Sequence, residues 1–261
     1  MSSTGAGGNY FVDCPADWHM ECVSEIDSTN LELLRKIRQG VQKNIEILQA
    51  DHQTNGRGTR GRKWLSVESS LTFSVAVPVK ENLDCYTALP LVVGYHVVET
   101  LRDNRIPAQL KWPNDVLLYG RKLAGILVET AKDMSGRWVF VIGIGLNLRV
   151  GQASLMTDYD IAGVNEVPGS CLDKYFWLRK LTQAVVDAVL DRKSNGLSPI
   201  KEAWNKVSAY KGEWVDITSE DGATYSAQIL GIDDQGCLLV DREGSINKLM
   251  SGMVKIRKRL T

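Results

Sequence analysis

One set of hydrophobic positions along the chain follows a helical period. Leu31, Leu34 and Ile37 recur at this spacing, which places them on one face of a helix. Asp27 and Ser28 precede them and can cap the first turn. The same reasoning predicts helices at residues 28–39, 89–104, 175–195 and near residues 200–207.

A second set of hydrophobic positions alternates with small or polar residues, as in a strand. Leu71, Phe73 and Val75 begin the clearest run, which continues as far as Val79. Gly120 separates two further runs. Strands are expected at residues 44–51, 71–79, 116–119, 123–130 and 138–146. Strands and helices in this order predict an α+β domain.

Roughly the last fifty residues have a different pattern. Short β runs are separated by the turn signals Asp221-Gly222, Gln235-Gly236 and Glu243-Gly244. This spacing predicts a small β-barrel, with a domain boundary near residues 210–212. The N-terminal stretch MSSTGAGGNYF has no such pattern and is expected to be flexible. The predicted parts are therefore a leader at 1–22, a domain at 23–210 and a β domain at 211–261.

Composition argues against several classes of protein. The 261 residues carry no net charge, whereas a dedicated nucleic-acid-binding protein usually has a basic excess. No apolar run reaches about 18 residues, so no membrane span is expected, and no secretory signal is recognisable. The five cysteines are scattered and form no C-x-x-C pair. A reducing, cytoplasmic location fits this usage best.

The stretch Asn55-Gly-Arg-Gly-Thr-Arg-Gly-Arg-Lys-Trp64 combines three glycines with four cations. Its glycines match the letter pattern of a dinucleotide loop, but an alternating strand follows them where that motif requires a helix. The companion motifs of protein kinases and a Walker A sequence are absent. Cations on a glycine-rich loop suit binding of phosphate or carboxylate. A charged, solvated turn is the alternative.

Three other positions carry candidate chemistry. Asp115 lies at a strand edge, where it can cap a turn or hold Mg²⁺ on a nucleotide. Lys122 begins an apolar strand and is either a surface lysine or a fixed positive charge beside a ligand. The stretch Gly143-Ile-Gly-Leu-Asn147 allows either close packing or the close approach of a planar ligand.

Together these stretches resemble the biotin protein ligases. The resemblance runs from about residue 24 to residue 257, and the order of its motifs is specific although each alone is moderate. The motifs are Asp27-Ser-Thr-Asn30, Gln53, Gly56-Arg-Gly-Thr-Arg-Gly-Arg-Lys-Trp64, Lys111-Trp-Pro-Asn-Asp115, Arg121-Lys-Leu-Ala-Gly-Ile126 and Gly143-Ile-Gly-Leu-Asn147.

The resemblance implies a fold and an activity. The fold would be a catalytic domain similar to class II aminoacyl-tRNA synthetases, with a mixed, largely antiparallel sheet, and a small SH3-like C-terminal β-barrel. In the implied reaction, biotin and ATP with Mg²⁺ give biotinyl-5′-AMP. The biotinyl group then passes to a lysine of a biotin carboxyl carrier protein domain. Positive groups would neutralise the two anions, and no covalent enzyme nucleophile is needed.

The resemblance also implies which residues form the site. The catalytic residues would be Lys122, Arg57 and Asp115, of which Asp115 would also serve Mg²⁺. The biotin-binding residues would be Ser28, Thr29, Asn30, Gln53, Gly56, Arg57, Lys122 and Gly125. The residues for ATP or the adenylate would be Gly58, Arg60, Arg62, Trp64, Lys111, Asn114, Asn147 and Arg257.

The chain departs from the family pattern at Thr59, where the loop usually carries an arginine. We expect either that Arg60 takes over this role or that the adenylate is held less tightly. Only 26 residues precede Asp27, so we expect a form without the N-terminal DNA-binding domain of some members. Monomers and dimers both occur in the family, which leaves a homodimer open.

Three other functions compete with this interpretation. A lipoate or octanoate ligase would share the fold, but the Lys111–Asp115 motif together with the glycine loop favours biotin. A sensor of biotin or nucleotide has no need of the reacting charges at Lys122, Asp115 and Arg57. A nucleic-acid binder would show basic residues beyond one loop, so no nucleic-acid or membrane partner is expected.

Overall fold

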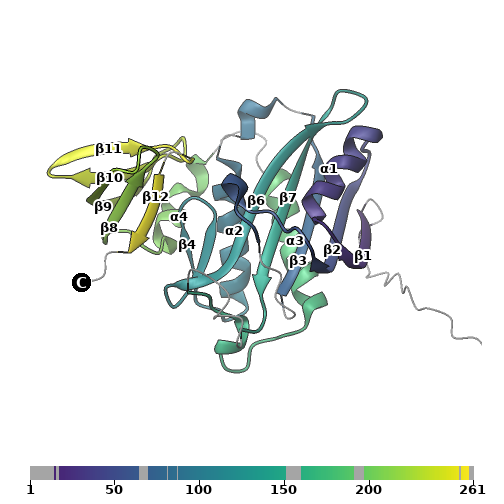
Figure 1. The fold of residues 1–261 in the computed structure, drawn as a ribbon, viewed down its shortest axis with the longest axis horizontal. Helices are drawn as coiled ribbons and strands as arrows, with labels where there is room; N and C mark the ends of the chain where they lie inside the picture. The colour runs from purple at the N-terminus through teal and green to yellow at the C-terminus, as the bar shows by residue number, and fades with distance from the viewer. Residues whose placement is uncertain are drawn as a thin grey trace, which may run out of the picture.

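The protein is described by a computed structural model that covers residue 15 and residues 18–64, 70–80, 82–86, 88–150, 160–190, 197–252 and 254–258. Over these residues seven strands form a mixed sheet in the order β1-β2-β3-β7-β6-β5-β4 (Figure 1). Only the β1–β2 pair is parallel. The strands are β1 at Trp18–Ile26, β2 at Ile45–Gln53, β3 at Ser70–Pro78, β4 at Ala108–Lys111, β5 at Asp115–Leu118, β6 at Arg121–Lys132 and β7 at Trp138–Asn147.

Helices cover both faces of this sheet. The helix α1 packs on one face through Leu33, Leu34 and Ile37, which belong to one buried cluster with Val139 and Val141 of β7. The helices α2 and α3 pack together on the other face. The described helices are α1 at Thr29–Gln39, α2 at Leu89–Asp103, α3 at Lys174–Leu190 and α4 at Lys201–Val207.

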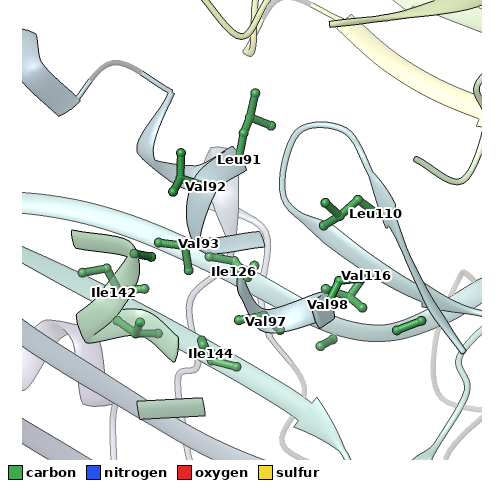
Figure 2. Close-up of a cluster of buried hydrophobic side chains, with 14 of the residues drawn as sticks. Leu91, Val92, Val93, Val97, Val98, Leu110, Val116, Ile126, Ile142 and Ile144 are labelled. Carbon is green, nitrogen blue, oxygen red and sulfur yellow. The ribbon is translucent and has the colours of Figure 1, made fainter. Parts of the chain in front are cut away.

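The core between α2 and the sheet is built from branched aliphatic side chains (Figure 2). Val93 and Val97 of α2 are fully buried together with Ile142 and Ile144 of β7. Val139 and Val141, which alternate with these residues along β7, belong to the other face of the sheet. Truncating one of these isoleucines to alanine would cost about 2–5 kcal/mol. The sheet is therefore a rigid platform with both faces packed.

A separate antiparallel sheet follows the larger one and lies beside α4 and β4 (Figure 1). The buried indole of Trp112 donates from Nε1 to the carbonyl oxygen of Gly236 at 3.0 Å, which ties the two sheets together. Its described strands, in the order β11-β10-β9-β8-β12, are β8 at Trp214–Ser219, β9 at Thr224–Ile232, β10 at Leu238–Arg242, β11 at Ser245–Leu249 and β12 at Val254–Lys258.

Most of the expected elements are confirmed. The four helices and the five strands of the first domain are present, and Ser28 caps α1 by accepting a hydrogen bond from the Leu31 amide. The end of the third helix, beyond Leu190, lies outside the described residues. The α+β class, the mixed sheet and a separate β region at the C-terminus are likewise confirmed.

The leader was predicted to extend too far. Residues 18–22 were assigned to it, yet they begin β1, which pairs in parallel with β2 from Trp18 opposite Ile45 onwards. Parallel pairing with a strand about 27 residues away leaves no local turn signal, which is why the pattern missed this strand. The four-residue β4 was also missed, because so short a run shows little alternation.

In the part of the chain that the structure describes, no helix is long and apolar enough to cross a membrane.

Candidate functional site

A hollow that is partly open to solvent lies over the middle of the large sheet, and its empty space of about 660 Å³ includes part of the solvent outside it. Its walls come from the start of α1, from β2, β3, β6 and β7, and from the loop that joins β2 to β3. The described residues that line it are Ser28, Thr29, Asn30, Gln53, Arg57, Gly58, Thr59, Arg62, Lys63, Trp64, Thr72, Phe73, Asn114, Lys122, Gly125, Ile126, Leu127, Gly143, Ile144 and Gly145.

One end of the pocket is polar and uncharged. The Thr29 amide donates to Oε1 of Gln53 at 2.8 Å, so the Gln53 amide group is held at the end of β2. The Thr29 hydroxyl lies 2.6 Å from Oγ of Ser74. Ser28, Thr29 and Ser74 are all buried. Hydroxyl and amide groups in this arrangement suit a ligand that both donates and accepts hydrogen bonds.

The loop between β2 and β3 folds back on itself over the pocket. The Gly58 amide donates to the carbonyl oxygen of Arg62 at 2.7 Å, and the Trp64 amide donates to that of Gly56 at 2.9 Å. A Cβ atom at Gly56 would lie 2.5 Å from the Trp64 carbonyl oxygen, so only glycine fits there. The glycines therefore allow a compact loop that carries Arg57, Arg62 and neighbouring cations.

Trp64 forms a wall of the pocket by lying on two glycines of the sheet. A Cβ atom at Gly145 would lie 2.2 Å from the indole ring, and one at Gly125 would lie 3.1 Å from it. Close packing, one of the two expectations for the glycines of β7, is therefore confirmed. The Nε1 atom of Trp64 is buried and has no hydrogen-bond partner among the described residues.

The charge distribution of the pocket is one-sided. Arg57, Arg62, Lys63 and Lys122 line it, and no described lining residue is acidic. The Lys122 ammonium lies 5.5 Å from the Trp64 ring centroid, and both line the same pocket. The acidic partner Asp115 contacts Lys122 at 2.7 Å from outside the lining. A pocket with this charge attracts anions.

Lys111 adds to this positive field from outside the pocket lining. Burial lowers the pKa of its ammonium, the nearby Asp115 carboxylate opposes the shift, and the positive charges of Lys122, Arg62 and Arg257 lower the pKa further. The structure thus brings Lys111 and Arg257, which are far apart in sequence, into one electrostatic neighbourhood. An anion bound here would relieve the mutual repulsion of these cations.

Two asparagines of the expected site hold backbone in place. Nδ2 of Asn147 donates to the carbonyl oxygens of Lys122 and Ala162, both at 3.2 Å, so Asn147 positions the strand that carries Lys122. Nδ2 of Asn114 donates to the Ile126 carbonyl oxygen at 2.8 Å. Of these two asparagines, only Asn114 lines the pocket.

Arg60 reaches away from the pocket in this structure. Its Nη2 atom donates to the carbonyl oxygen of Val254 at 2.9 Å, which ties the loop to β12 of the small sheet. The residue also has a left-handed backbone, with φ of 60°. Thr59 instead contacts Arg62, whose Nη2 lies 3.2 Å from the Thr59 hydroxyl. The expectation that Arg60 takes over from Thr59 therefore has no support in this geometry.

The lining contains eleven of the residues expected from the sequence and leaves out six. Those that line the pocket are Ser28, Thr29, Asn30, Gln53, Arg57, Gly58, Arg62, Trp64, Asn114, Lys122 and Gly125. Those outside the lining are Gly56, Arg60, Lys111, Asp115, Asn147 and Arg257. Sequence reasoning did not name Thr72, Phe73 or Ile144 as site residues, although the alternation of β3 and β7 marks strands that could have contributed them.

No metal site is evident among the residues that the structure describes, since no three acidic, histidine or cysteine side chains converge there. Asp115 is the residue expected to bind Mg²⁺, and its Oδ1 atom already contacts the Lys122 ammonium. Lys122 neutralises this carboxylate, so the residues that the structure describes do not form a preformed cage for Mg²⁺.

Comparison with known proteins agrees with this geometry. A model of the biotin/lipoate A/B protein ligase family matches residues 23–147. The bifunctional ligase/repressor BirA of Salmonella typhimurium is 32% identical over 238 residues, which are 89% of this chain and 72% of that protein. The biotin–[acetyl-CoA-carboxylase] ligase of Mycobacterium tuberculosis is 30% identical over 241 residues, which are 90% and 88% of the two chains.

A solved structure has the same architecture. The biotin protein ligase of Aquifex aeolicus in complex with biotin and ATP superposes with a TM-score of 0.78 and 28% identity, over 92% of this chain and 99% of that one. The chain therefore belongs to the biotin/lipoate A/B protein ligase family, among its biotin protein ligases.

Proposed function

We propose that the chain joins biotin to a specific lysine of a biotin carrier domain in a biotin-dependent carboxylase, in two steps driven by ATP. The relatives named for this activity, and the related structure described with biotin and ATP, support the substrates. The observation that carries the proposal is the pocket itself. It has an uncharged polar end beside Thr29 and Gln53 and a cationic part beside Arg57 and Lys122.

In the first step an oxygen of the biotin carboxylate forms a bond to the α-phosphorus of ATP. The bond from that phosphorus to the bridging oxygen of pyrophosphate breaks, and biotinyl-5′-AMP remains. Two anions must approach each other, so the cationic side chains of Arg57 and Lys122 are proposed to neutralise the charge that concentrates in the transition state. Lys122 suits this role because it is largely buried and held between Asp115 and Trp64.

In the second step the neutral amine of the carrier lysine forms a bond to the carbonyl carbon of the mixed anhydride. The bond from that carbon to the phosphate oxygen breaks, AMP leaves, and the amine nitrogen loses its proton. Asp115 is proposed to serve this side of the site, because its carboxylate lies just outside the pocket lining. No side chain of the enzyme needs to form a covalent bond with biotin.

Individual residues have proposed roles. Ser28, Thr29 and Gln53 would hold the ureido ring of biotin, because together they offer donors and acceptors. Trp64 would stack on the nucleotide, and its Nε1 donor would find a partner there. Arg257 would contribute a positive charge from the small sheet. Its charge lowers the pKa of Lys111, which supports its closeness to the site. The assignments of Asn30, Gly56, Gly58, Arg60, Arg62, Asn114, Gly125 and Asn147 remain proposals.

Magnesium would enter the site with the nucleotide as the counter-ion of the triphosphate. The chain's carboxylates form no cage for it among the described residues, so we assign no step to the ion. A role of Asp115 toward magnesium would require the Lys122 contact to open when ATP binds.

We also propose several finer features of the fold and of the protein's location and partners. They are a resemblance to class II aminoacyl-tRNA synthetases, an SH3-like closure of the C-terminal sheet and a division between domains near residue 211. A cytoplasmic location, a homodimer and the absence of a nucleic-acid partner are also proposals. Cys171 and Cys237, which form no disulfide among the described residues, fit a reducing compartment.

The test is biotin-dependent exchange of labelled pyrophosphate into ATP, which reports the first step without a carrier protein. We expect exchange with biotin and none above background with lipoate or octanoate as parallel substrates. Exchange only with lipoate or octanoate would assign the chain to the other branch of the family. Biotin binding without any exchange would favour a sensor.

A further inference from the structure

Glu129 of β6 joins two parts of the site although it does not line the pocket. Its Oε1 atom lies 3.0 Å from Nη2 of Arg57 on the loop. Its Oε2 atom accepts a hydrogen bond from Nδ2 of Asn30 on α1 at 3.0 Å. Only about a fifth of the Glu129 side chain is exposed. One carboxylate therefore holds both the loop and the helix.

The Asn30 amide continues this connection toward the polar end of the pocket. Its Oδ1 atom accepts from the Ser74 hydroxyl at 2.5 Å, and the Ser74 oxygen lies 2.6 Å from the hydroxyl of Thr29. These three side chains are buried. One ion pair and a continuous row of hydrogen bonds thus run along the pocket from Arg57 through Glu129 to Thr29.

The carboxylate sets the direction of every hydrogen bond in this row. An ionised carboxylate can only accept, so Asn30 must turn its NH₂ group toward Glu129 and its carbonyl oxygen toward Ser74. Ser74 then donates its one hydroxyl proton to Asn30 and accepts the proton of Thr29. The shorter contact of Thr29, 2.6 Å to Ser74 against 3.2 Å to Gln53, agrees with this direction.

The direction of these hydrogen bonds determines which donor and acceptor groups the polar end of the pocket presents to a ligand. With its proton given to Ser74, the Thr29 oxygen presents a lone pair to the pocket. Oε1 of Gln53 accepts from the Thr29 amide at 2.8 Å, so the NH₂ group of Gln53 is the part that can donate to a ligand. The end of the pocket therefore offers an acceptor and a donor in fixed places, which matches the N–H and C=O groups of a cyclic urea.

The backbone of β7 is shaped around this row. A Cβ atom at Gly143 would lie 2.3 Å from Oδ1 of Asn30 and 3.1 Å from its Cγ. Any side chain at this position would displace Asn30, because the clash includes the branching atom of the amide. Gly143 therefore provides the space that Asn30 needs to reach Glu129 and Ser74 together.

We propose that Glu129 is a positioning residue of the adenylation reaction. One of its oxygens holds Arg57 over the pocket, and the other fixes, through Asn30 and Ser74, the hydrogen-bonding direction of Thr29 at the biotin end. Glu129 thereby couples recognition of the ring to placement of the cation that acts on the carboxylate and phosphate. This inference rests on the proposed function, because it assumes that biotin and ATP are the substrates.

The first experiment compares the full chain with E129Q by pyrophosphate exchange. The amide keeps the shape of the side chain but loses the charge and one acceptor. We expect the KM for biotin to rise about tenfold and kcat to fall about tenfold. Compared with R57A alone, the double variant R57A/E129Q is expected to have the same kcat and a higher KM for biotin. In R57A the contact of Glu129 with the loop is already absent, so E129Q can act only through Asn30. A purely structural role would not divide the two constants in this way.

The matched control is E21Q. Glu21 on β1 pairs with Lys36 of α1 at 2.6 Å, away from the pocket lining. The same substitution there removes an ion pair from the same helix, so both constants are expected to stay within twofold of the parent chain. If E129Q also stays within twofold, the proposal is overturned.

The second experiment exchanges the amide of Asn30 and the carboxylate of Glu129, so that the carboxylate lies on α1 and the amide on β6. N30D alone places two carboxylates against each other and is expected to raise the KM for biotin more than tenfold. In N30D/E129Q, the amide introduced on β6 donates to the carboxylate introduced on α1. That carboxylate accepts from Ser74, so the hydrogen-bonding direction at Thr29 is restored. We expect the KM for biotin to return to within threefold of the parent. A double variant as impaired as the two single changes combined would refute the coupling.

The parent chain separates this inference from the proposed function. If the parent shows no biotin-dependent exchange, the proposed function has failed, and the role of Glu129 in adenylation fails with it. If the parent exchanges normally and the Glu129 variants behave like E21Q, the coupling alone has failed. Melting temperatures of all variants, measured without ligand, identify any loss of folding, and the double variant provides the test should E129Q prove unstable.

Discussion

The Nζ atom of Lys122 lies 2.7 Å from Oδ1 of Asp115, across a pair of strands whose register shifts between them. The shift falls between Val116 and Leu117 of β5 and marks a β-bulge, a feature that often redirects a side chain beside an active site. Each side chain of the ion pair is about a fifth exposed. Lys122 is thus held at the pocket with a counter-ion that an anionic substrate can replace.

The first prediction concerns this lysine. K122M removes the charge and keeps most of the aliphatic chain. We expect kcat for biotin-dependent pyrophosphate exchange to fall about 100-fold, because a preorganised positive group beside the reacting oxygens commonly contributes that much. The control is K36M, which removes a lysine that pairs with Glu21 away from the pocket. A loss smaller than about fivefold in K122M would exclude the proposed role.

The second prediction concerns the glycine beneath Trp64. In G145A the new Cβ atom would lie 2.2 Å from the indole, so the ring must move away from the sheet. We expect a loss of about 1–3 kcal/mol of stability and a clear rise in the KM for ATP, which unfolding and exchange kinetics would measure. G40A is the control, since its Cβ would meet only ordinary contact at 3.6 Å. Equal behaviour of the two variants would argue against Trp64 as a wall of the nucleotide site.

The third prediction concerns the residue that departs from the family pattern. In T59R a guanidinium would be added to the pocket lining, where Thr59 now contacts Arg62. We expect slower release of biotinyl-5′-AMP, because the added cation attracts its phosphate. A chase of labelled adenylate with unlabelled biotin and ATP would give the rate. T59V, which removes the hydroxyl without adding charge, should not slow release, and an unchanged rate in T59R would reject the idea.

The fourth prediction concerns acid stability and the turn between β6 and β7. The side chain of Asp133 is closed to solvent and accepts bonds from the Ser135 hydroxyl at 2.6 Å and from the backbone amides of Gln42, Ser135 and Arg137. The Ser135 hydroxyl and these amides lower the pKa of Asp133 to about 2, against the opposing effect of burial.

Because the folded pKa lies below the unfolded value, the Asp133 carboxylate stabilises the fold above about pH 4. This contribution is lost as the pH falls toward about 2. D133N should therefore lower the melting temperature at pH 7, and its difference from the parent should shrink as the pH falls through this window. D221N, in a turn with a single amide contact to Ala223, is the control and should change little. A difference for D133N that does not depend on pH would contradict this assignment.

Much of the pocket lining was named from motifs, because the chemistry of a motif is local. The glycines of the loop are needed for contacts between Gly56, Gly58, Arg62 and Trp64, which lie within ten residues of one another. Other roles could not be predicted in this way. No motif indicates that the guanidinium of Arg60 contacts the backbone of Val254, 194 residues away. The direction of a flexible side chain depends on distant neighbours that a motif does not contain.

The sequence by itself determined the elements that depend on short-range physics. The cap at Ser28, the helical spacing behind it and the alternation of β3 are all recognisable within about ten residues, since helix and strand periods are local properties. Only the tertiary structure decided that residues 18–22 join the sheet and that Glu129 bonds to Asn30, 99 residues earlier. Such contacts depend on how strands are ordered in the sheet, and no local period records that order.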